Sequence, residues 1–163
     1  MATSRHLSRV IVLQTVFSHE LHNGDPERAF NYIASDFDEK LNDYTFAKSL
    51  LNGVIKEIPN LREHIVKHAP QWPIDKIAPI DRVILEIGTY ELLYSGDVPE
   101  VVAMDEAIEL AKAFGNENSP KFINGVLNGI FNDTTIARAP RKPRDDRGSA
   151  IQGSDTFVKC LCA

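Results

Sequence analysis

The spacing of apolar residues predicts helices along almost the whole chain up to about residue 131. The clearest segment is 98–131, in which apolar residues recur every three or four positions and so share one helical face. Gly115 and Asn116 interrupt this pattern, because both tolerate the left-handed backbone that ends helices. Pro99 and Pro120 stand where a helix accepts proline, in its first turn. The apolar positions are Ala103, Ala107, Leu110, Ala111 and Phe114, then Phe122, Ile123, Val126, Leu127, Ile130 and Phe131.

The same period predicts five earlier helices. Asn23-Gly24 ends the first, Asp25-Pro26 begins the second, and Pro59 either ends the third or begins the fourth. Leu21 and Val66 belong to the apolar faces of the first and fourth helices. In the fifth helix the residues expected to face inward are Ile80, Val83, Ile84, Ile87, Tyr90 and Tyr94. The ranges are about 4–22, 26–37, 43–58, 61–68 and 79–94, with a proline-rich connector from Gln71 to Pro79 that carries Trp72. No segment shows the alternation of a strand. We therefore expect an all-α fold of about seven helices joined by short loops.

Composition changes near residue 137. The chain has 163 residues, so we predict a helical domain over 1–136 and a tail over 137–163. The tail is rich in Arg, Pro, Asp, Gly and Ser, and this composition predicts disorder. Its Cys160 and Cys162 cannot cross-link a core, which favours a reducing, cytoplasmic location. No apolar run approaches the roughly 20 residues that span a membrane.

Charge is divided unevenly between the two parts. The whole chain carries −5, but six basic and three acidic residues from Arg138 onward give the tail +3. The first 137 residues therefore carry −8. Nonspecific affinity for nucleic acid comes from neutralising phosphates. An acidic body thus predicts that any RNA site is a local basic patch or depends on a partner.

Motifs for catalysis are lacking in the sequence. It contains no nucleophile elbow, P-loop or dinucleotide-binding glycine motif. His64 and His68 can share a helix face, but the segment HIVKH lacks the glutamate of a zinc-protease helix. Cys160 and Cys162 have the wrong spacing for a zinc knuckle. We therefore predict no catalytic residues, no metal and no cofactor, and interpret the chain as a binding protein rather than an enzyme.

Two groups of residues are candidates for binding RNA. Arg5 and Arg9 lie four positions apart on the first helix, and His6 widens this basic arm. Lys121 and Phe122 follow Ser119, a candidate helix cap, where free backbone N–H groups attract phosphate and an exposed ring stacks a base. The alternatives are that the arm is an ordinary solvated helix start and that Phe122 belongs to the core.

Several segments of the chain are similar to segments of one known family and follow one another in the same order. Over about residues 5 to 131, the chain resembles the NusB family of bacterial transcription antitermination factors. The segments that carry the resemblance are LQTVFS (13–18), LLNGVIKEIPNL (50–61), IDRVILEIGTYEL (80–92), VPEVVAMDEAIELAKAFG (98–115) and SPKFINGVLNGI (119–130).

The resemblance implies two small helical bundles packed together, without enzymatic activity or metal. It implies a protein that binds boxA RNA of nascent ribosomal RNA transcripts together with the ribosomal protein NusE, within an antitermination complex of RNA polymerase. By position, the implied RNA-binding residues are Arg5, His6, Arg9, Asn118, Ser119, Lys121 and Phe122, and the implied NusE-binding residues are Phe17 and Asp81. Some family members form homodimers through the surface that binds NusE.

One departure from the family pattern stands out. The family arm is usually denser in arginine, whereas Leu7 and Ser8 interrupt it here. We therefore expect RNA binding to depend heavily on NusE. Two alternatives stay open from the sequence alone. One is a fragment of a ribosomal RNA cytosine methyltransferase, whose N-terminal domain is NusB-like, and the other is an interaction module that has lost RNA binding.

Overall fold

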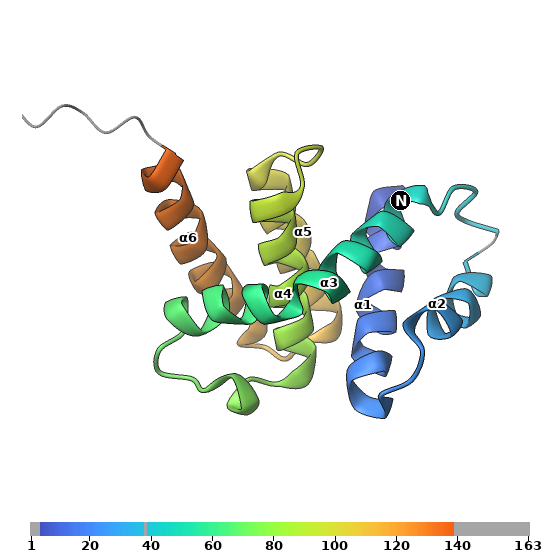
Figure 1. The fold of residues 1–163 in the computed structure, drawn as a ribbon, viewed down its shortest axis with the longest axis horizontal. Coiled ribbons are helices and arrows are strands. Elements are labelled where there is room, and N and C mark those ends of the chain that lie inside the picture. The colour runs from blue at the N-terminus through green and yellow to red at the C-terminus, as the bar shows by residue number, and fades with distance from the viewer. Residues whose placement is uncertain (1–3, 38, 139–163) are drawn as a thin grey trace, which may run out of the picture.

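The computed structural model describes residues 4–37 and 39–138. This part of the chain contains six α-helices, one turn of 3-10 helix and no strand (Figure 1). The elements are α1 (Ser4–His22), α2 (Pro26–Ser35), α3 (Thr45–His68), η1 (Ile74–Lys76), α4 (Pro79–Tyr94), α5 (Glu100–Phe114) and α6 (Ser119–Arg138). The predicted all-α class with about seven helical segments is confirmed.

The helices form two groups that share α3. In one group α1 packs against α2 and α3, and in the other α4, α5 and α6 pack against one another. Helix α3 begins beside α1 and continues across α4 to α6, so it belongs to both groups (Figure 1). Helix α4 contacts α1, α3, α5 and α6. This arrangement agrees with the two packed bundles that the family resemblance implied.

The helix ends follow the local signals in the sequence. Asn23 ends α1 with a left-handed backbone, at a φ of 49°. Asp25 then caps α2, since its side chain accepts a hydrogen bond from the Glu27 backbone N–H at 3.2 Å. Asp43 accepts one from the Thr45 N–H at 2.8 Å where α3 begins. Short polar side chains thus fix where these helices start.

Pro59 does not divide α3, although the sequence predicted two helices separated there. The helix runs without interruption from Thr45 to His68 with Pro59 inside it. An internal proline removes one backbone hydrogen bond and costs about 3 kcal/mol. Leu61 and Ile65, which follow it, are fully buried. Burial of these residues offsets the cost of the proline, because helix stability in proteins comes mostly from packing of the apolar face.

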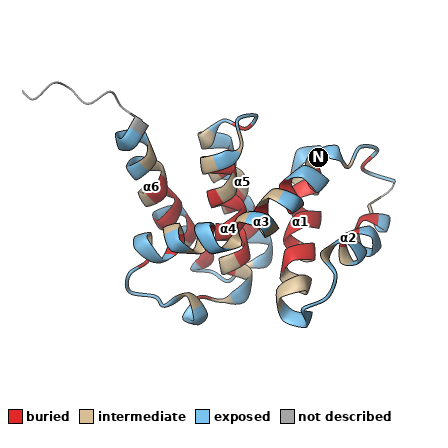
Figure 2. Cartoon of the chain, in the orientation of Figure 1, coloured by how far each residue is buried: buried red, intermediate tan, exposed pale blue. Residues whose placement is uncertain are grey.

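The predicted stripes form the core, with four exceptions near helix ends. Figure 2 shows buried residues along the facing sides of all six helices. Leu21, Val66, Tyr94 and Phe114, however, are 54%, 45%, 46% and 37% exposed. Each lies in the last turn of its helix. Tyr94 instead stacks on Tyr90, with ring centroids 5.5 Å apart.

Helices α3 and α4 approach each other closely at Gly53. A Cβ at this position would lie 2.0 Å from the Tyr90 hydroxyl oxygen. Only glycine leaves room for the tyrosine ring against the α3 backbone. The glycine in the segment LLNGVIKEIPNL is therefore explained by helix packing.

A buried ion pair joins α1 to α4. Arg9 and Glu91 have side chains only 2% and 1% exposed. The Arg9 Nη2 donates to Glu91 Oε1 at 2.7 Å, and its Nε donates to Glu91 Oε2 at 2.9 Å. Such a two-point pair fixes both the position and the orientation of the guanidinium. Arg9 therefore sets how the first helix lies against α4.

A second charged cluster lies between α1, α3 and α4. Glu20 pairs with Arg62 and with Arg82, and Arg62 donates from Nε to Glu86 Oε1 at 2.7 Å. Glu86 is fully buried, and its Oε2 has no hydrogen-bond partner among the described residues. Burial, and secondarily the negative charge of Glu20, raise the pKa of Glu86 to about 7.

Two further findings concern the end of α6 and the character of the helices. Helix α6 ends at Arg138, so residues 139–163 of the predicted tail, with Cys160 and Cys162, lie outside the described residues. Among the helices that are described, none combines the length and apolar character required to cross a bilayer.

We expect Arg9→Ala to lower the free energy of unfolding by about 3–5 kcal/mol, because it leaves the Glu91 carboxylate buried without its partner. Urea denaturation measures this loss. The double change Arg9→Met with Glu91→Leu removes both charges and should regain most of the stability. A double variant as unstable as the single one would contradict this account.

We also expect the stability of the protein to fall as the pH rises from about 4.5 to about 7. A carboxyl has its ordinary pKa of 4.5 in the unfolded chain and about 7 at Glu86 in the folded one. The folded state therefore binds the proton more tightly across this window, and its advantage is lost as the pH rises.

The change Glu86→Gln should flatten this slope by up to about 1.4 kcal/mol per pH unit, because the amide does not ionise but still accepts from Arg62. Urea denaturation at several pH values measures the slope. Glu109→Gln is the control, since Lys112 lowers the pKa of that exposed carboxyl, which therefore titrates below the window. An unchanged slope in Glu86→Gln would show that another group titrates.

Candidate nucleic-acid interface

The three residues of the basic arm occupy different environments. Arg5 is exposed, whereas Arg9 is 1% exposed and bound to Glu91. His6 is half-buried, and its Nδ1 lies 2.7 Å from Glu106 Oε2. Of the two arginines of the arm, the structure thus exposes only Arg5, beside a histidine that is paired with an acidic residue of α5.

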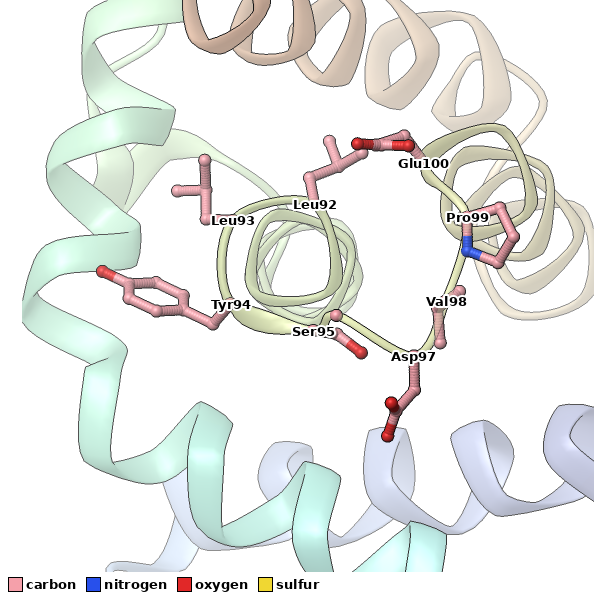
Figure 3. A pocket seen from close by; sticks show the side chains of 9 residues that line it. Leu92, Leu93, Tyr94, Ser95, Asp97, Val98, Pro99 and Glu100 are labelled. Atoms are coloured by element: carbon pink, nitrogen blue, oxygen red, sulfur yellow. The ribbon is translucent and has the colours of Figure 1, made fainter. Parts of the chain in front are cut away.

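Arg5 is held in place by aromatic and backbone contacts. Its guanidinium carbon lies 5.0 Å from the centroid of the Phe46 ring, close enough for a cation–π interaction. Its Nη1 also donates to the Asp97 carbonyl oxygen at 3.5 Å. Figure 3 shows the turn between α4 and α5, in which Asp97 is directed toward α1. These contacts orient Arg5 while leaving its side chain accessible.

Phe46 also contacts Arg9, whose guanidinium carbon lies 5.2 Å from the ring centroid. Phe46, Glu91 and Glu106 together determine how the arm is arranged. None of these three was among the predicted site residues. Each lies at least 37 positions from Arg9, so no local pattern connected these residues to the arm.

The second predicted group lies where α6 begins. Asn118 and Lys121 are exposed, and Phe122 is half-buried against the core. Ser119 is 1% exposed, and its Oγ accepts a hydrogen bond from the Asn116 N–H at 2.9 Å. Ser119 therefore shapes the loop before α6, while its neighbours present their side chains to solvent.

The two groups lie at opposite ends of α4. Arg5 contacts Asp97, just after this helix, whereas Asn118 and Phe122 line a groove with Asp81, in its first turn. Sixteen residues form α4, which at 1.5 Å per residue is about 24 Å long. A single RNA segment that contacts both groups must therefore extend along the length of α4.

The two residues assigned to partner binding come from α1 and α4. Phe17 is half-buried on α1 and packs against the core. Asp81 is 5% exposed, and its Oδ1 has no hydrogen-bond partner among the described residues. Helices α1 and α4 are packed together.

The described residues contain no group of three or more His, Cys, Asp or Glu side chains suited to a metal. Of the two histidines considered for zinc, His68 bonds through Nε2 to Asp133 Oδ2 at 2.9 Å and through Nδ1 to the His64 carbonyl oxygen at 2.8 Å. Its ring therefore connects α3 to α6.

Comparison with known proteins gives consistent matches over the helical part. The NusB family profile matches residues 6–132. The transcription antitermination protein NusB of Bacillus pumilus is 42% identical over 129 residues, which cover 79% of this chain and 95% of that protein.

Solved structures match over a similar span. The structure of T. maritima NusB superposes with a TM-score of 0.72 at 34% identity, covering 82% of this chain and 94% of that one. A structure described as antitermination factors NusB and NusE in complex with dsRNA has a TM-score of 0.73 at 23% identity, covering 82% and 99%, and supports the fold. The family profile covers most of the chain and the Bacillus pumilus relative is 42% identical to it. The chain therefore belongs to the NusB family.

Proposed function

We propose that this protein is a transcription antitermination factor that binds boxA RNA of nascent ribosomal RNA transcripts together with the ribosomal protein NusE. The observation that carries the proposal is the oriented and exposed Arg5, presented on a NusB fold. Relatives with up to 42% identity are named as antitermination proteins, and a similar fold was solved with NusE and double-stranded RNA.

The RNA surface in this proposal has two parts. Arg5 and His6 meet phosphates at the start of α1. Arg9 is held inside by Glu91 and supports them indirectly, because it shares the Phe46 ring with Arg5 and the Glu106 carboxylate with His6. Asn118, Lys121 and Phe122 bind RNA at the start of α6, and Ser119 supports their loop. Between these two ends the RNA crosses the molecular surface over a distance similar to the length of α4, which is itself mostly buried.

NusE, in this proposal, docks where α1 and the start of α4 lie together, beside Phe17 and Asp81. Its contribution is electrostatic as well as geometric. The first 137 residues carry −8, and Glu91 and Glu106 offset the charges of the arm. A partner that supplies additional positive charge would overcome this repulsion of phosphates. The protein acts in the cytoplasm as a binding subunit without catalysis of its own.

We expect Arg5→Ala to weaken binding of the NusE complex to boxA RNA and to reduce its salt dependence. Loss of one phosphate contact on single-stranded RNA lowers the slope of log affinity against log salt by about 0.7. The unfolding free energy should change by less than about 1 kcal/mol, since the cation–π contact is exposed. Fluorescence anisotropy of labelled RNA over a series of salt concentrations measures the slope. Lys56→Ala, at an exposed position of α3, is the matched control; equal effects of both changes would contradict a specific role for Arg5.

We further expect the isolated protein to bind boxA RNA weakly and the complex with NusE to bind it tightly. The acidic body and the single exposed arm arginine are the physical reasons. Anisotropy titrations with and without purified NusE measure the difference, and a scrambled RNA of the same composition is the control. An affinity that NusE does not change would contradict the dependence, and no binding in either condition would favour an interaction module without RNA recognition.

A further inference from the structure

Two grooves share Trp72 in their lining. Trp72 belongs to the connection between α3 and α4, whose course Figure 1 shows. The first, of about 510 Å³, is lined by Trp72, Phe122 and Lys121 among others. The second, of about 420 Å³, is lined by Trp72 and Phe122 again, with Lys76 and Asp81. The two aromatic residues therefore border both grooves.

Trp72 is exposed although hydrogen bonds hold the backbone of the connection between α3 and α4 in place. Its side chain is 54% exposed, although tryptophan is among the most strongly apolar residues. The backbone around it is nevertheless bonded, since Trp72 N–H donates to the Ala69 carbonyl at 3.0 Å and Lys76 N–H to the Pro73 carbonyl at 2.8 Å. Ala69 and Ile77, on either side, are buried. The connection is thus anchored at both ends while the ring stays in solvent.

The grooves also contain an unsatisfied acceptor. Asp81 is 5% exposed, and its Oδ1 is buried without a hydrogen-bond partner among the described residues. A buried acceptor of this kind costs free energy unless a donor reaches it. Asp81 lines the second groove, so rotation of its carboxyl group would offer this oxygen to an N–H at the edge of a ligand there.

These features together are complementary to a ligand with flat apolar faces, N–H groups at its edge and a negative charge. The aromatic residues supply stacking surfaces, and Lys76 and Lys121 supply positive charge. An unpaired RNA base with its phosphate has all three properties. A cationic side chain from a protein partner also stacks on tryptophan, but the two lysines oppose it.

We infer that Trp72 and Phe122 form a stacking site for an unpaired RNA base, with Asp81 accepting from the edge of the base. The inference rests on the proposed function and extends it, because Trp72 was not among the predicted site residues. The site adjoins Asn118 and Lys121, so it continues the RNA surface from α6 onto the connection before α4. It places the base beside Asp81, at the border of the proposed NusE surface.

The test uses the fact that Trp72 is the only tryptophan in the chain. Its intrinsic fluorescence therefore reports on this groove alone, provided that the NusE used contains no tryptophan. The complex is titrated with single-stranded boxA RNA, and fluorescence of Trp72 is followed in parallel with anisotropy of labelled RNA. We expect quenching that saturates at the same RNA concentration as the anisotropy.

Substitutions give an independent readout. Trp72→Ala should weaken RNA binding by about tenfold or more, whereas Trp72→Phe, which keeps a stacking face, should retain most of the affinity. Tyr32→Ala is the matched control, since that aromatic ring is 78% exposed on α2. Helix content measured by circular dichroism verifies that each variant is folded.

The other outcomes separate failure of this inference from failure of the proposed function. RNA binding by anisotropy without quenching, and with Trp72→Ala as tight as the wild type, would overturn the stacking site but leave the function standing. Quenching by NusE alone, with no further change on adding RNA, would assign the groove to the protein partner and overturn the inference. No binding of RNA in any condition would overturn both.

Discussion

The buried pair between Arg9 and Glu91 is the interaction on which the arrangement of the rest depends. Two charges with almost no exposure to water are tolerated only when their geometry satisfies both, and here the guanidinium binds both carboxylate oxygens. The pair fixes α1 against α4, the helix that contacts four of the other five described α-helices. It also determines which arm residues reach the surface, because it holds Arg9 inside and leaves Arg5 outside.

Helix α4 is consequently central both to the packing of the helices and to the proposed function. Its last turn leads to Asp97, which contacts Arg5, and its first turn carries Asp81, beside the groove at Trp72. The electrostatic field along this helix is mixed, because Glu91, Glu106 and the Glu20 cluster lie among the arginines. Such a surface positions RNA through a few oriented groups. In the proposed function, most of the electrostatic attraction for the RNA phosphates comes from NusE.

Most of the fold followed from the sequence. Apolar residues at helical spacing, caps such as Asp25 and turns such as Asn23-Gly24 specified the helices, since these effects act within a few residues. The resemblance to the NusB family, carried by ordered motifs, was confirmed by the family match. The stripes misplaced Leu21, Val66, Tyr94 and Phe114, because periodicity shows which residues share a helix face but not whether a neighbouring element covers them. The arm was also predictable as a cluster, but its division into one buried and one exposed arginine was not.

The sequence by itself determined the helical class, the approximate boundaries and the family. The tertiary structure alone decided that α3 continues through Pro59, that Arg9 and Ser119 are buried, and that the ring of Trp72 stays in solvent. The physical reason is the range of the interactions. Helix propensity and capping are local, whereas the burial of a side chain depends on partners far away in the chain, such as Glu91, 82 positions from Arg9.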